Sequence, residues 1–289
     1  MPSDLHLESR YFERMARSLG DKAKIVDALP PVIPGTHPRV LDVGAGGGEF
    51  ADYLTRLGYH VVALDASDDA IVRMRENFSG LTTAKMLANE SVTLGSGSFD
   101  AVVCSSIMHE VYSYGDNDSL RGDYAAVDHA LNAFFEILRP GGVLIIRDGV
   151  KPENWEEEAV IRVLDESEKP VEKYLEMCPF ANGKISYDVK LKNMHGLWFG
   201  NVRAAYEFYM TYNWGLDSYP RETQEMYGIY TLNEYVTALT HHGFQVEEAH
   251  SWFQPGYAVH LPEKVEFHTN KGRNLFPDTN ALWVARKPE

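Results

Sequence analysis

The chain has few cysteines, a deficit of positive charge and no long apolar segment. Its two cysteines, Cys104 and Cys178, have neither a metal-binding nor a redox spacing. No apolar run reaches the roughly 18 residues that a membrane-spanning helix requires. The opening MPSDLHLESR lacks a cationic region followed by an apolar one, the pattern of a secretory signal. These absences predict a cytoplasmic protein in a reducing compartment, without a membrane partner.

Acidic residues outnumber basic ones across the 289 residues. Lysine and arginine total 27 and aspartate and glutamate total 42, which gives a formal net charge of −15. A surface of this sign repels phosphate backbones unless basic residues cluster, and no run of lysine or arginine occurs. The composition therefore disfavours nucleic acid as a partner.

Apolar strands alternate with amphipathic helices between residues 37 and 150. The expected strands are 39–45, 60–66, 99–106 and VLIIRDG, with a weaker one near TTAKML, and the helices between them include EFADYLTRLG, DDAIVRMRENF and DYAAVDHALNAFFEIL. This alternation predicts an α/β fold with a doubly wound, mostly parallel sheet covered by helices on both faces. Helices are also expected within 1–36.

A glycine-rich turn follows the first expected strand, in VLDVGAGGGEF. Gly44, Gly46 and Gly48 stand at alternate positions before a helix, where they permit a tight turn and bring a ligand against bare backbone. Asp65 ends the next strand, at the distance where an acidic residue meets the hydroxyls of a ribose. This pattern alone fits either NAD or S-adenosylmethionine.

Two residues favour S-adenosylmethionine over the dinucleotide. The dinucleotide motif has a glycine where this chain has Glu49, and the first strand places Asp42 just before the turn. A carboxylate there repels a pyrophosphate, whereas it attracts the ammonium group at the methionyl end of S-adenosylmethionine.

Three motifs in order resemble the class I S-adenosylmethionine-dependent methyltransferases: VLDVGAGGGEFADYLTRLGYHVVALDAS, GSFDAVVCSSIMHEV and FFEILRPGGVLII. The resemblance covers residues 38–150 and its closing pattern returns in 231–288. It implies a Rossmann-like, seven-stranded, mostly parallel sheet with an antiparallel last strand. The strand–helix pattern stops after residue 150 without a linker-like segment. We therefore expect a single domain with N-terminal helices (1–36), a cofactor-binding half (37–150), an aromatic helical cap for substrate (151–230), and a closing helix and strands (231–289).

The resemblance also assigns residues to the cofactor, with S-adenosylhomocysteine as the product. The turn Gly44-Ala45-Gly46 would pass beneath the methionyl part, with Asp42 near its amino group. Asp65 would hold the ribose, and Ala66 and Ser67 would lie beside the adenine. The family often has an acidic residue after its third strand, where this chain has KMLANESV; Asn89 or Glu90 would take its place. Ser105, at the end of the fourth strand, would flank the sulfonium.

His109 and Glu110 follow the fourth strand, where the resemblance places the methyl acceptor. An acceptor hydroxyl or ammonium group must lose a proton, and histidine is suited to accept one at neutral pH. Glu110 could orient the imidazole, act as the base or pair with a cationic acceptor. Packing of His109 against the cofactor is the alternative. Adjacent residues diverge by about 100° on a helix, so both cannot face one ligand, and their adjacency argues against a metal site.

The segment between residues 195 and 230 is unusually aromatic and contains a helix in AAYEFYMTYNW. A helix that is aromatic on all sides is usually buried, so core packing is the first interpretation. Tyrosine and tryptophan also suit a pocket for a ring or a cation. The candidate substrate contacts in this segment are Tyr209, Trp214 and Arg221, the last as an anchor for a carboxylate or phosphate. Tyr11, Tyr112 and Tyr114, from outside the segment, could complete a lid over the pocket.

The sequence thus predicts an S-adenosylmethionine-dependent methyltransferase that acts on oxygen or nitrogen of a small organic molecule. Two alternatives remain open: methylation of RNA or a nucleotide, and a non-catalytic regulator that binds S-adenosylmethionine. An NAD-dependent enzyme ranks last.

Overall fold

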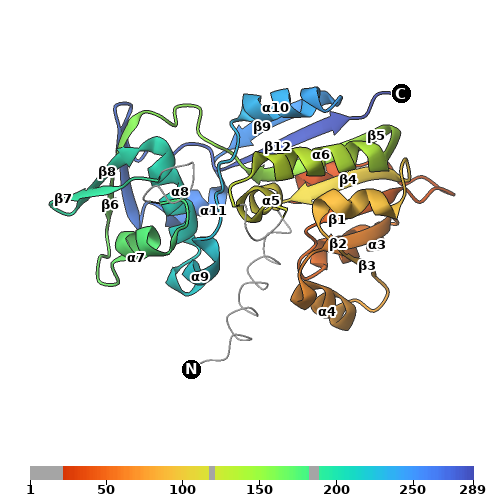
Figure 1. The fold of residues 1–289 in the computed structure, drawn as a ribbon, viewed down its shortest axis with the longest axis horizontal. Helices are drawn as coiled ribbons and strands as arrows, with labels where there is room; N and C mark the ends of the chain where they lie inside the picture. Colours follow the sequence, from red (N-terminus) through yellow and green to blue (C-terminus); the bar gives the residue numbers. More distant parts are fainter. Residues whose placement is uncertain (1–21, 117–120, 182–188) are drawn as a thin grey trace.

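The computed structural model describes residues 22–116, 121–181 and 189–289, which form two β-sheets with their helices (Figure 1). The larger sheet has the order β3-β2-β1-β4-β5-β12-β9. Its strands are β1 (Arg39–Val43), β2 (His60–Asp65), β3 (Thr82–Lys85), β4 (Phe99–Ser105), β5 (Leu138–Gly149), β9 (Gln245–Trp252) and β12 (Asn280–Arg286). Strands β1 to β5 run parallel, and β12 lies antiparallel between β5 and β9. The expected doubly wound sheet with an antiparallel last strand is confirmed.

Helices cover both faces of this sheet because its strands are apolar on both sides. In β4, Val102 and Cys104 belong to one buried cluster, and Ala101 and Val103 belong to the other. This alternation is the two-residue period of a strand buried on both faces. The first face packs against α5 (Met108–Tyr114), α6 (Tyr124–Ile137) and α10 (Leu232–His241). The second packs against α2 (Ala23–Asp27), α3 (Glu49–Arg56) and α4 (Asp68–Asn77).

The cap differs from the helical insertion expected over 151–230, because it contains a second sheet. Its antiparallel strands, in spatial order β11-β10-β6-β8-β7, are β11 (Gly272–Arg273), β10 (Val265–Thr269), β6 (Glu158–Val163), β8 (Leu197–Asn201) and β7 (Lys192–Met194). Two of these strands come from the segment expected only to close the large sheet. The cap is therefore mixed α/β and is built from both parts of the chain.

The cap also contains the expected aromatic helix. Its helices are α7 (Pro170–Met177), α8 (Val202–Asn213), η3 (Leu216–Ser218), α9 (Tyr219–Glu222) and α11 (Pro255–His260). Every side chain of α8 from residue 202 to residue 211 is buried. Tyr206 and Tyr209 pack edge to face with ring centroids 5.5 Å apart, and Phe208 stacks on Tyr212 at 5.4 Å. Core packing, the first interpretation of this helix, is confirmed.

Helix α5 lies between the large sheet and the cap (Figure 1). The Ser113 hydroxyl accepts a hydrogen bond from the Met226 backbone N–H at 2.8 Å, and the Tyr114 hydroxyl donates to Glu225 Oε1 at 2.9 Å. The segment after β4 therefore connects the two parts of the molecule. Within the described residues, no helix combines the length and apolar character needed to cross a membrane.

Candidate functional site

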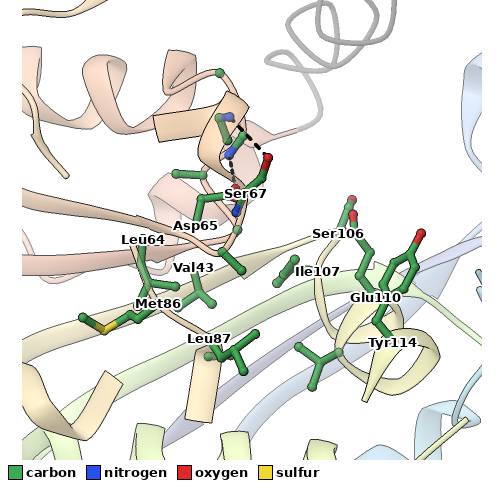
Figure 2. A pocket seen from close by; sticks show the side chains of 18 of the residues that line it. Val43, Leu64, Asp65, Ser67, Met86, Leu87, Ser106, Ile107, Glu110 and Tyr114 are labelled. Atoms are coloured by element: carbon green, nitrogen blue, oxygen red, sulfur yellow. Dashed lines mark hydrogen bonds between the residues drawn. The ribbon is translucent and has the colours of Figure 1, made fainter. Parts of the chain in front are cut away.

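A cavity of ≈ 260 Å³ opens at the carboxyl ends of β1, β2 and β4. This is the edge at which open α/β sheets bind ligands. The glycine turn after β1, the residues after β2, the start of η2 (Ala88–Leu94) and α5 form its walls. In Figure 2, Asp65 and Ser67 lie on one side of the pocket, and Ser106, Glu110 and Tyr114 lie on the other.

The glycine turn is held close to β2 and α5. Backbone N–H groups of Gly44 and Ala45 both donate to the Leu64 carbonyl, at 2.8 and 3.0 Å. Gly44 has a φ of +69°, and a Cβ added to it would lie 2.5 Å from Cγ1 of Ile107. Gly46 has a φ of +56°. Glycine is therefore required by backbone conformation and, at residue 44, by the side chain opposite.

Asp65 organises the turn through both carboxylate oxygens. Its Oδ2 accepts from the Gly46 N–H at 2.9 Å, and its Oδ1 accepts from the Ser67 N–H at 2.9 Å. Burial raises the pKa of Asp65, against the lowering effect of these hydrogen bonds. The N-cap of α4 is Ser67, whose hydroxyl accepts from the Ala70 N–H. Asp65 is therefore not needed as a cap, and its carboxylate faces the pocket.

Asp42 is 2% exposed beneath the turn, and within the described part of the chain its Oδ2 has no hydrogen-bond partner. Burial raises the pKa of Asp42 to about 7, and the positive charge of Lys22 opposes this shift. Lys22 lines the cavity, and burial lowers the pKa of its ammonium group. No local motif indicates Lys22, because only the folded chain brings the residue before α2 to the glycine turn.

The far wall of the cavity contains apolar side chains and one amide. Leu64, Met86 and Leu87 line it together with Asn89, whose Nδ2 donates to Asp116 Oδ1 at 2.8 Å. Glu90 was the other candidate here, but its carboxylate accepts from the Leu87 N–H at 2.8 Å and does not line the cavity. Its position at the start of a 3-10 helix explains this, because an acidic residue there caps free N–H groups.

His109 and Glu110 have different surroundings. Glu110 lines the cavity, whereas His109 is 5% exposed and points into the protein. His109 Nδ1 donates to Asp148 Oδ1 at 2.6 Å, and the His109 backbone N–H donates to Asp148 Oδ2 at 3.1 Å. The Nε2 atom lies 3.4 Å from Glu225 Oε2. The two side chains therefore differ in their access to the cavity, although a ring nitrogen of His109 and a carboxylate oxygen of Glu110 lie within 4.8 Å of each other.

These side chains form a buried acidic cluster with Glu222. Burial and the charge of Glu225 raise the pKa of Glu110 to about 8, and the same two causes raise that of Glu222 to about 8. Burial alone would lower the pKa of His109, but the charge and hydrogen bond of Asp148 raise it well above its ordinary value. The expectation that adjacency argues against a metal site stays a prediction, although Glu225 joins the pair from the cap.

Several predicted residues lie away from the cavity. Ser105 is buried in β4, and the next residue, Ser106, lines the cavity instead, with a φ of +59°. Tyr112 packs in the core against Tyr124 and Phe180. Tyr209 and Trp214 also do not line the cavity, and both belong to the apolar packing of the cap.

Aromatic composition could not separate core from pocket in these cases, because both environments favour the same side chains. Tyr114 and Arg221 do line the cavity. Tyr11 lies outside the described residues.

Sequence reasoning missed Glu222, Glu225 and Asp148. The two glutamates follow Arg221 in RETQE, an acidic pair three residues apart in an otherwise aromatic segment. Asp148 ends the apolar run of β5, and a carboxylate at the carboxyl end of a buried strand is itself a signal of a site.

Comparison with known proteins identifies residues 41–146 as a match to a family model described as a methyltransferase domain. An uncharacterized methyltransferase of Synechocystis is 33% identical over 40% of this chain and 50% of its own length. A ubiquinone biosynthesis O-methyltransferase of Xylella fastidiosa is 30% identical over 42% of this chain and 46% of its own. The match thus spans at most half of these relatives.

Solved structures extend the similarity of fold over most of the chain. An S-adenosylmethionine-dependent methyltransferase from Mesorhizobium loti aligns with a TM-score of 0.53 and 16% identity, over 91% of this chain and 96% of that one. The fold expected from the resemblance to class I S-adenosylmethionine-dependent methyltransferases is confirmed over most of the chain, and residues 41–146 resemble a methyltransferase domain.

Proposed function

We propose that this chain transfers a methyl group from S-adenosylmethionine to oxygen or nitrogen of a small organic molecule and releases S-adenosylhomocysteine. The observation that carries the proposal is the placement of two acids around a glycine turn. Asp65 faces the cavity beyond the turn, and Asp42 lies beneath it with a buried oxygen that accepts no hydrogen bond from the described residues.

The residues present fit the cofactor. An unpaired buried carboxylate oxygen is costly, and an ammonium group would satisfy that of Asp42. Lys22, on the same side of the cavity, is placed to meet the carboxylate of the methionyl group. Asp65 would accept hydrogen bonds from the ribose. Ala66 and Ser67 would lie beside the adenine, with Asn89 available to its polar edge.

The charge of the cavity supports a small acceptor over RNA or a nucleotide. Of the described residues that line it, the only basic ones are Lys22 and Arg221, against the acidic Glu49, Asp65, Glu110 and Asp116. A site for a phosphate backbone needs the opposite balance. Methylation at oxygen is further supported by the relatives named as ubiquinone biosynthesis O-methyltransferases. The cytoplasmic location remains a prediction.

Methyl transfer requires above all that the acceptor be held in line with the methyl group. When bound, the cofactor supplies an activated methyl group on a sulfonium. The side chains expected to act on the acceptor are Glu110 and Tyr114, which line the wall opposite the glycine turn. His109 lies behind them on Asp148 and would act as a positioning residue. Arg221 is the candidate anchor for an anionic group of the acceptor.

Calorimetry of the purified chain with S-adenosylhomocysteine and with NAD tests the cofactor. Binding of the first and not of the second is expected, and the reverse would refute the proposal. Incubation with methyl-labelled S-adenosylmethionine then tests the acceptor class. Label should enter the small-molecule fraction of a cell extract. Label in RNA would favour nucleic acid methylation, and binding without any transfer would favour a regulatory protein.

A further inference from the structure

Glu110 belongs to a cluster of titratable side chains at the contact between the large sheet and the cap. A carboxylate oxygen of Glu110, one of Glu225 and a ring nitrogen of His109 all lie within 4.8 Å of one another. The three residues come from α5 and from the segment after α9, so the contact between sheet and cap assembles them. His109 and Glu225 are buried, and Glu110 is half-buried at the cavity wall.

Hydrogen bonds from behind orient these side chains. Asp148 accepts from Nδ1 of His109, which directs Nε2 toward Glu225. A carboxylate behind a histidine in this way is the usual outer partner of a metal-binding imidazole. Tyr114 donates to Oε1 of Glu225 and leaves Oε2 toward the imidazole, 3.4 Å from Nε2. In both His109 and Glu225, one polar atom is therefore held by a hydrogen bond and the other faces the space between them.

Glu222 supplies a second, separate indication of a cation. It is 2% exposed, Tyr227 donates to its Oε2, and its Oε1 has no hydrogen-bond partner within the described structure. Tyr227, which donates to Glu222, also stacks on the ring of His109 with centroids 5.1 Å apart, so Glu222 lies beside the cluster. A buried, unpaired carboxylate oxygen is costly unless a cation meets it.

We propose that His109 Nε2, Glu110 and Glu225 bind a divalent transition-metal ion, with the carboxylate of Glu222 beside them. Imidazole together with carboxylates suits manganese, iron or zinc, whereas calcium prefers oxygen ligands alone. Ligand atoms about 2.1 Å from such an ion lie roughly 3.0–4.2 Å from one another, so small side-chain movements would close the site.

The proposed ion would lie beside the cofactor, where it would contact the methyl acceptor. Because Glu110 lines the cavity, an ion on Glu110 could bind an acceptor oxygen and lower the pKa of its hydroxyl group. This use rests on the proposed methyl transfer. The metal site itself does not, since it depends only on the three ligand side chains and the residues that orient them.

The test is metal binding by the full chain after treatment with a chelator. Titration with MnCl₂, followed by the electron paramagnetic resonance signal of free Mn²⁺, should show one ion per chain, and ZnSO₄ should displace it. Electron spin-echo spectra of the bound Mn²⁺ should show coupling to an imidazole nitrogen. Both measurements use the wild-type chain, so they test the metal site even if a variant fails to fold.

Two variants and one control complete the design. Glu225→Gln and Asp148→Asn should each weaken Mn²⁺ binding about 10–100-fold. Glu234→Gln, which removes a carboxylate paired with Lys151 outside the cluster, should bind as wild type.

Absence of bound Mn²⁺ and Zn²⁺, or affinity unchanged in Glu225→Gln, would overturn the inference. Calorimetry with S-adenosylhomocysteine on the same metal-free protein separates the two proposals. Cofactor binding without metal binding refutes only the metal site, and metal binding without cofactor binding refutes only the proposed function.

Discussion

Substitution of Asp65 by alanine should weaken binding of S-adenosylhomocysteine more than any other single change at the cavity. The carboxylate has two expected tasks, because it would hold the ribose hydroxyls and it already accepts from the N–H groups of Gly46 and Ser67. Asp65→Ala removes the ribose contacts and also leaves the turn without its two hydrogen bonds.

The magnitude follows from the charge of the acceptor group. A hydrogen bond to a charged group contributes about 1.5–3 kcal/mol, and each 1.4 kcal/mol is about a factor of ten in the dissociation constant. Loss of the ribose contacts should therefore raise the dissociation constant at least about tenfold. Asp65→Asn keeps one acceptor oxygen of the same shape and should lose less affinity.

Isothermal titration calorimetry on Asp65→Ala, Asp65→Asn and the surface control Asp69→Ala provides the measurement. Asp69 is exposed in the first turn of α4, so its replacement should leave affinity unchanged. If Asp65→Ala binds S-adenosylhomocysteine as the wild type does, the ribose placement is refuted. Melting curves of each variant separate loss of affinity from loss of folding.

Three further results are expected. Gly44→Ala should lower the free energy of unfolding by about 2–4 kcal/mol in urea titrations, because its Cβ would meet Ile107 at a positive φ; a change below about 0.5 kcal/mol would contradict the reading of the turn. The stability of Asp42→Asn relative to the wild type should increase as pH rises from 5 to 8. Burial raises the pKa of Asp42 in the folded state to about 7, above its value in the unfolded chain, so the wild type loses stability as pH rises toward 7. The same variant should lose cofactor affinity, and a pH-independent difference would contradict the assignment. Finally, S-adenosylhomocysteine should slow hydrogen exchange in 221–228 and leave the buried residues 202–211 unchanged, whereas protection confined to the latter would contradict the position of the site.

The cofactor-binding half could be predicted because its signals are local. In the run from β1 to β2, each strand is a short apolar segment, each helix has an amphipathic period, and the glycines stand together in sequence. Asp42 and Asp65 are placed by the ends of these strands, and parallel strands bring their carboxyl ends to one edge. For the described residues between 38 and 150, the elements expected from the local sequence therefore agree with those of the fold.

The cap could not be predicted in the same way because its pairings are distant in sequence. Strand β6 pairs with β10, so that Val163 lies opposite Val265. Both strands alternate between buried and more exposed residues, but this alternation does not indicate which strand is the partner. The acids of the site depend on this assembly. Glu225 reaches His109 only when the cap closes on α5, and Lys22 reaches the glycine turn only through tertiary packing.

Contacts within the cap hold the acids of the site, and we therefore expect the cap to affect acceptor specificity more than cofactor binding. Glu207, buried on α8, accepts from the backbone N–H groups of Tyr227 and Gly228 at 2.8 and 3.0 Å. Tyr227 in turn donates to Glu222 and stacks on His109, with ring centroids 5.1 Å apart. The aromatic helix thus acts on the site through the segment after α9 and not by direct contact. Changes within the cap should therefore alter what is bound beside Glu110 before they alter what is bound at the glycine turn.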